Sequence, residues 1–122
     1  MWIVLVEWRI RKGREDEFLD YWSTRSRVGN RAGLVAEFLS RAESSEAFPW
    51  IRWETDPSWT TYVNVGIWST ASAFQENFGR FIDDSQPPMD FEAERRRRVI
   101  LESERWRMGA VALPSSDHPK VL

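Results

Sequence analysis

Asn64 and Trp68 lie four residues apart in a segment, residues 62–68, that we predict to be a strand. Because side chains alternate across a strand, an amide and an indole N–H at this spacing emerge on the same face. Gly66 stands between them and leaves a gap where a ligand could approach the backbone. An amide and an indole N–H beside such a gap could orient a hydroxyl or carbonyl oxygen of an aromatic molecule. A structural role also fits, in which Asn64 bonds a neighbouring strand and Trp68 fills the core.

The rest of the chain is rich in side chains that could line such a pocket. Of its 122 residues 42% are hydrophobic, and eight are Trp and seven Phe. Trp buries a large flat surface and keeps one N–H that needs a partner, so this composition fits a bulky core or a pocket for planar ligands. We take Asn64 and Trp68 as candidate catalytic residues. The candidate substrate-binding residues are Val6, Trp8, Trp22, Tyr62, Gly66, Phe74 and Phe78.

Other kinds of site find little support. The chain has no Cys, and its one His, His118, lies beside Pro119 in a polar tail. These features argue against thiolate chemistry, against catalysis by His and against metal binding by His. We expect neither a metal nor a cofactor.

Residues 95–98 are four consecutive Arg, a run that can bind phosphate or RNA. On a strand these side chains would divide two to each face, and acidic residues flank them. The net charge of −2 also gives no general attraction to nucleic acid. We expect salt bridges across a dimer, or one Arg reaching the pocket, and no nucleic-acid partner.

No segment has the length and apolarity of a membrane span, and the first residues do not form a signal peptide. We therefore expect a cytoplasmic protein with no membrane partner.

Hydrophobic patterning predicts strands over residues 2–11, 34–41, 62–68 and 96–102. Helices are predicted over residues 14–28 and after Ser69, a possible N-cap, as far as Pro87. The second helix has an apolar stripe at i, i+4, i+7 and i+8, made by Phe74, Phe78, Phe81 and Ile82. Residues 103–107 are predicted to add a short helical turn. We expect one domain, residues 1–113, and a tail, residues 114–122.

This order of strands and helices predicts an α+β fold of the ferredoxin-like type, with both helices on one face of an antiparallel sheet. The first strand carries apolar residues on both faces, because Ile3 and Leu5 oppose its main apolar row. A second apolar face is too large to leave in water, so we expect a second copy to cover it and form a homodimer.

Residues 42–61 contain two Pro and three Trp, and two interpretations remain open. The segment is either a long functional loop or an extended hairpin arm that continues the sheet. Its Trp-rich part, residues 48–59, would act as a lid over the pocket or as an arm that clasps the partner.

Two short motifs resemble the antibiotic biosynthesis monooxygenase-like family of dimeric α+β barrels. One is Asn64-x-Gly66-x-Trp68-Ser69 followed by Phe74, and the other is the run 9–13 followed by Glu17 and Phe18. The resemblance covers the layout of residues 2–101. It implies a dimeric α+β barrel with a pocket between sheet and helices, into which Trp68 and Asn64 would face.

The family includes oxygenases that turn aromatic polyketide phenols into quinones without a cofactor, and oxygenases that degrade haem. Quinone-forming relatives place a Tyr six residues after the Trp, where this chain has Phe74. Haem degraders place a His ten residues after it and an Asn on the first strand, where Phe78 and Val6 stand.

Three hypotheses follow for the pocket. It oxidises a planar aromatic substrate without a cofactor, it binds a planar apolar molecule without turnover, or it is closed around its own side chains.

Overall fold

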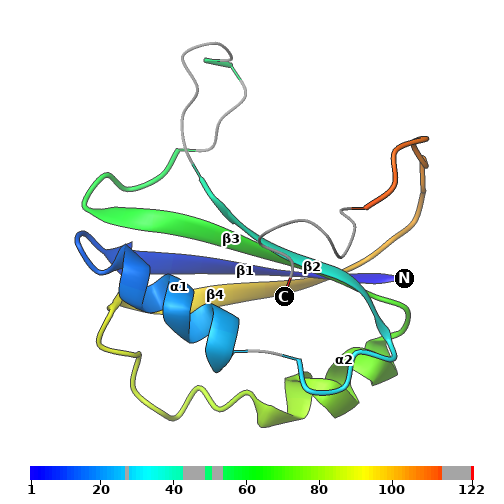
Figure 1. Ribbon diagram of the computed structural model, residues 1–122, viewed down its shortest axis with the longest axis horizontal. Helices are drawn as coiled ribbons and strands as arrows, with labels where there is room; N and C mark the ends of the chain where they lie inside the picture. The colour runs from blue at the N-terminus through cyan, green and yellow to red at the C-terminus, as the bar shows by residue number, and fades with distance from the viewer. Residues whose placement is uncertain (27, 43–48, 51–53, 114–121) are drawn as a thin grey trace.

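The structure of the protein is a computed structural model that describes residues 1–26, 28–42, 49–50, 54–113 and 122 (Figure 1). Its elements are β1 (Trp2–Arg11), α1 (Glu15–Thr24), β2 (Leu34–Arg41), β3 (Trp59–Trp68), α2 (Ala71–Asn77), the 3-10 turn η1 (Gly79–Phe81) and β4 (Glu92–Glu102).

The four strands form one sheet in the order β2-β3-β1-β4, and each neighbouring pair is antiparallel. This is an α+β fold with an open antiparallel sheet, compatible with the ferredoxin-like arrangement that the sequence predicts.

Both helices pack on the same face of the sheet, as expected from the sequence. The ring centre of Phe18 in α1 lies 5.0 Å from that of Tyr62, and the ring centre of Phe74 in α2 lies 5.7 Å from that of Trp68. Tyr62 and Trp68 are six residues apart in β3 and therefore share a face. Figure 1 shows α1 and α2 on the same side of the sheet, and we call this face of the sheet the helix face.

The core fills the layer between the helix face and the helices. Every second residue of β1 points into it, from Val4 to Ile10, and Phe18 of α1 is fully buried against them. The first residue of α1 is tied to the sheet, because Thr60 in β3 donates a hydrogen bond of 2.7 Å to Glu15. The opposite face of the sheet, which we call the open face, lies away from both described helices.

Two of the strand pairings contain irregularities. In β2, Leu34 pairs with Trp68 and Ala36 with Ile67, so Val35 is an extra residue, a β-bulge. In β4, the register against β1 shifts twice, between Glu7 and Ile10 of β1. Each bulge changes which face the residues beyond it point to, because the side-chain period of a strand is two.

Several predicted boundaries differ from the observed ones. The third and fourth strands begin earlier than predicted, at Trp59 and Glu92, and α1 is shorter than the predicted helix. Thr70, and not Ser69, caps α2, since its Oγ1 accepts a hydrogen bond from the amide of Ala73. Residues 103–107 form no helical turn.

The predicted apolar stripe of the second helix is confirmed only in part: Ile82 still packs against the core, but Phe81 does not. The helix α2 ends at Asn77, and the chain turns back so tightly that a Cβ on Gly79 would collide with the side chain of Gln75. The 3-10 turn that follows leaves Phe81 68% exposed.

Part of the segment 42–61 lies outside the described residues, namely 43–48 and 51–53, so the choice between loop and hairpin arm stays open. Of its Trp residues, Trp50 is exposed and Trp59 belongs to β3. His118 also lies outside the described residues. Among the helices that the structure describes, none has the length and apolarity needed to cross a membrane.

Candidate functional site

Asn64 is a polar side chain buried in the core. It lies in the middle of β3, directly opposite Val6 of β1, and is only 6% exposed. Along β3 it stands between Tyr62, which packs under α1, and Trp68, which packs under α2. The sequence prediction that Asn64, Gly66 and Trp68 share one face is confirmed by this register.

The amide of Asn64 is held by a carboxyl group from the neighbouring strand. Its Nδ2 donates a hydrogen bond of 3.0 Å to Oε1 of Glu37 in β2. Its Oδ1 is buried and accepts no hydrogen bond from any residue that the structure describes. A buried carbonyl oxygen without a partner costs about 1–3 kcal/mol, so this atom is placed where a donor would be favoured.

Glu37 lies directly opposite Gly66 in the register between β2 and β3. Burial raises the pKa of its carboxyl above the usual 4.5, while the hydrogen bond from Asn64 and the charge of Arg31 oppose that rise. An ionisable group with a perturbed pKa beside a buried unpaired amide oxygen is a candidate for function.

The gap expected over Gly66 is occupied by the side chain of Trp68. A Cβ added to Gly66 would lie 3.2 Å from the indole nitrogen of Trp68, which is 3% exposed. The indole nitrogen therefore lies over the glycine, across the strand pair from Glu37. Because Gly66 has no side chain, the edge of the indole ring can lie against the sheet. A larger residue at this position would obstruct the ring.

The aromatic candidates divide into two clusters on either side of Asn64. Under α1, Trp8 packs against Phe18 at 4.9 Å between ring centres, and the guanidinium of Arg96 lies 3.9 Å from the centre of the Trp8 ring. Trp8 Nε1 is also buried without a described partner. Under α2, Trp68 meets Phe74, which in turn meets Phe78.

All nine candidate residues thus lie in or against one core. Seven of them are buried: Val6, Trp8, Tyr62, Asn64, Gly66, Trp68 and Phe74. Trp22 and Phe78 are partly buried and pack on the same cluster. The hydroxyl of Tyr62 accepts a hydrogen bond from Arg41.

The Arg run is paired with carboxylates of the same chain. Arg97 bonds Glu7 at 2.8 Å on the open face, whereas Arg96 bonds Glu92. Arg95 and Arg98 both reach Asp84, at 3.7 and 2.8 Å. The expected division of two residues to each face was wrong, because the bulges in β4 shift the alternation.

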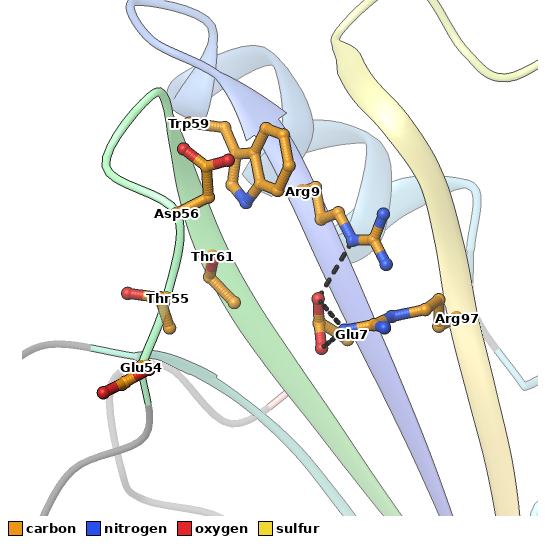
Figure 2. Close-up of a pocket in the computed structure, with 8 residues that line it drawn as sticks. All are labelled: Glu7, Arg9, Glu54, Thr55, Asp56, Trp59, Thr61 and Arg97. Atoms are coloured by element: carbon orange, nitrogen blue, oxygen red, sulfur yellow. Dashed lines mark hydrogen bonds and ion pairs between the residues drawn. The ribbon is translucent and has the colours of Figure 1, made fainter.

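A hollow of about 480 Å³ opens on the other side of the sheet. Figure 2 shows it between the strands β1, β3 and β4 and the chain that leads into β3, with α1 visible behind the sheet. Its lining residues are Glu7, Arg9, Glu54, Thr55, Asp56, Trp59, Thr61 and Arg97, and none of the nine candidate catalytic and substrate-binding residues is among them.

Three charged side chains of the hollow, Glu7, Arg9 and Arg97, satisfy one another. The carboxylate of Glu7 accepts hydrogen bonds from Arg9 at 2.9 Å and from Arg97, as the dashed lines in Figure 2 show. Burial works to raise the pKa of Glu7, but the hydrogen bonds from the two Arg outweigh it and the pKa falls below 4.5. Among the described residues that line the hollow, none has a buried side-chain polar atom without a partner, whereas Asn64 has one.

Glu37 was missed by the sequence analysis. Strict alternation from Leu34 would place Ala36 and Phe38 on the helix face and Glu37 on the other. The bulge at Val35 reverses this order and turns Glu37 inward. No turn residue or Gly marks the bulge, so period-two patterning could not find it.

In comparisons with known proteins, no family model and no curated protein matches this chain. Among the described residues, no group of three or more His, Asp or Glu is arranged to hold a metal ion.

Proposed function

We propose that this chain binds a planar aromatic hydroxy compound between its sheet and its helices, and that the carbonyl oxygen of Asn64 accepts the hydrogen bond of the hydroxyl group. The observation that carries this proposal is the buried Asn64 Oδ1 without a described partner. A hydroxyl group that donates to it would remove the cost of an unmet buried acceptor.

The surroundings of Asn64 favour an aromatic ligand. Rings of Tyr62 and Trp68 flank it along β3, and Phe74 packs against Trp68. Aromatic side chains of this kind pack well against a flat ring by offset or edge contacts. Because these side chains are closely packed in the described structure, ligand entry requires some of them to move apart.

For the reaction we propose oxidation of the bound phenol by molecular oxygen without a metal or organic cofactor. This is the chemistry that the resemblance to antibiotic biosynthesis monooxygenases implies. The ring carbon para to the hydroxyl group becomes a carbonyl, so that the phenol becomes a quinone. One atom of O₂ forms the new C=O bond, and the other leaves as water with the para hydrogen and the hydroxyl hydrogen. The protein would contribute by excluding water and by orienting the hydroxyl group through Asn64 Oδ1.

Oxygen uptake tests the reaction directly. With anthrone and 1-naphthol as probes, the protein should consume oxygen faster than buffer alone. Asn64→Leu should lower the rate by about tenfold or more, since it removes the oxygen that orients the hydroxyl. Glu102→Gln, a change on an exposed residue of β4, should leave the rate unchanged. Uptake equal to buffer with both probes contradicts catalysis.

Binding without turnover is the second candidate. It is favoured by Phe74 and Phe78, which stand where oxygenases of the resembled family carry Tyr and His. In this case 1-naphthol should quench Trp fluorescence in the wild type and more weakly in Asn64→Leu. The ligand recovered after incubation should be chemically unchanged.

We propose further that two copies pair through their open faces. Three of the apolar side chains on this face are over 40% exposed, Phe38, Val99 and Leu101. In the strand register they lie beside Ile3, Leu5, Val65 and Ile67, and together these side chains form one patch. An exposed apolar patch that spans neighbouring strands often marks an interface, and a second copy of the same face would cover it.

A further inference from the structure

We infer that Glu37 is a positioning residue, which orients the amide of Asn64 and thereby makes the site select ligands that donate a hydrogen bond. The inference rests on the proposed function, because it concerns the same site. It adds Glu37 to that site and states which ligands the site prefers, namely those that donate a hydrogen bond.

The geometry links the two side chains closely. Glu37 and Asn64 lie on neighbouring strands and face the helices, and their contact is the 3.0 Å hydrogen bond from Asn64 Nδ2 to Glu37 Oε1. The two polar atoms of an amide point in different directions. With Nδ2 turned to the carboxylate, Oδ1 is directed elsewhere, and it has no described partner.

The charge state of Glu37 decides which way the amide turns. An ionised carboxylate can only accept hydrogen bonds, so Asn64 must present Nδ2 to it and keep Oδ1 for the ligand. A protonated carboxyl can donate to Oδ1 once the amide has rotated by half a turn. The amide would then present Nδ2 to the ligand, and the site would favour molecules that accept.

Among the described residues, two arginines are the charged groups to consider around Glu37. Arg31, in the segment before β2, is the cation whose charge acts on its carboxyl. Arg31 itself donates a hydrogen bond to the backbone oxygen of Leu122. Arg41 lies on the same face of β2 and donates to Tyr62, while Gly66 and Asn64, across the strand pair, do not titrate. Burial raises the pKa of Glu37, which moves the change of amide orientation toward neutral pH.

Two matched probes test the selection. 1-Naphthol can donate a hydrogen bond, and its methyl ether, 1-methoxynaphthalene, can only accept. From about pH 4 to about pH 8, a range in which a phenol stays protonated, the ratio of their affinities should rise about tenfold in favour of naphthol. Glu37→Gln should make the ratio independent of pH, and the control Glu102→Gln should follow the wild type.

A measurement without ligand keeps the inference testable if Glu37→Gln does not fold. In wild-type protein labelled with nitrogen-15, the side-chain amide resonances of Asn64 should shift with pH along the titration curve of Glu37. If they do not shift, the coupling of the two side chains is overturned.

The outcomes separate the two proposals. Binding of naphthol with an affinity ratio that is constant with pH overturns the role of Glu37 and leaves the proposed site intact. Failure of both probes to bind at every pH overturns the proposed function and the ligand selection with it.

Discussion

The contact between Glu37 and Asn64 places an ionisable group against the apolar layer between sheet and helices. A second carboxylate, Glu92, is buried even more deeply, at 2% exposure, but its environment differs. Glu92 accepts hydrogen bonds from the Arg96 guanidinium and from the backbone amide of Met89. A buried charge with such partners is a structural anchor, whereas Asn64 keeps an unmet acceptor.

The raised pKa of Glu37 has a consequence for stability. Between pH 4.5 and its raised folded-state pKa, the folded protein binds more protons than the unfolded chain. The stabilising effect of this group is therefore fully present below pH 4.5 and is lost as the pH rises through the folded-state pKa. Gln does not ionise and carries no such loss.

We expect Glu37→Gln to gain stability relative to the wild type as the pH rises from acid to neutral. Urea unfolding of both proteins at several pH values measures the difference in free energy of unfolding. A difference that stays constant with pH would show that Glu37 has its ordinary pKa. Glu102→Gln serves as the exposed control.

At the scale of the elements, the sequence predicted the order of strands and helices and the faces of β1 and β3. It succeeded there because both strands alternate without interruption: Val4, Val6 and Trp8 are all buried, as period two requires. It failed in β2 and β4, where bulges reverse the alternation without a sequence signal. Glu37 owes its inward position to the bulge in β2, so it was not placed correctly beforehand.

The position of α1 depends on Phe18, which is fully buried against Trp8 and Tyr62. We expect Phe18→Ala to lower the free energy of unfolding by about 3–5 kcal/mol, because it leaves a cavity between helix and sheet. The next residue, Leu19, is 37% exposed, and Leu19→Ala should cost about 1 kcal/mol or less. Equal effects in chemical denaturation would contradict the observed rotation of α1.

At the scale of the whole molecule, the sheet has one face covered by its own helices and one face, partly apolar, that no described helix covers. The apolar part of the open face spans all four strands, and the charged hollow of Glu7, Arg9 and Arg97 lies beside it. A polar rim beside an apolar centre is the usual anatomy of a protein interface.

Two neighbouring residues of β4 provide a matched test of the homodimer. Val99 and Ile100 are 46% and 49% exposed, but Val99 points to the open face and Ile100 to the helix face. Val99→Glu would bury a charge between two copies and should raise the dimer dissociation constant about 100-fold or more. Ile100→Glu should leave it nearly unchanged. Sedimentation velocity measures both, and a monomeric wild type would contradict the pairing.

The central claim is that the ligand lies beside Asn64, between sheet and helices. The most direct measurement is a nitrogen-15 spectrum of the Trp indole N–H groups during titration with 1-naphthol, because Trp68 marks this site and Trp59 marks the hollow on the open face. We expect the Trp68 resonance to shift and that of Trp59 to stay in place. A shift confined to Trp59, or no shift in either, would contradict the account.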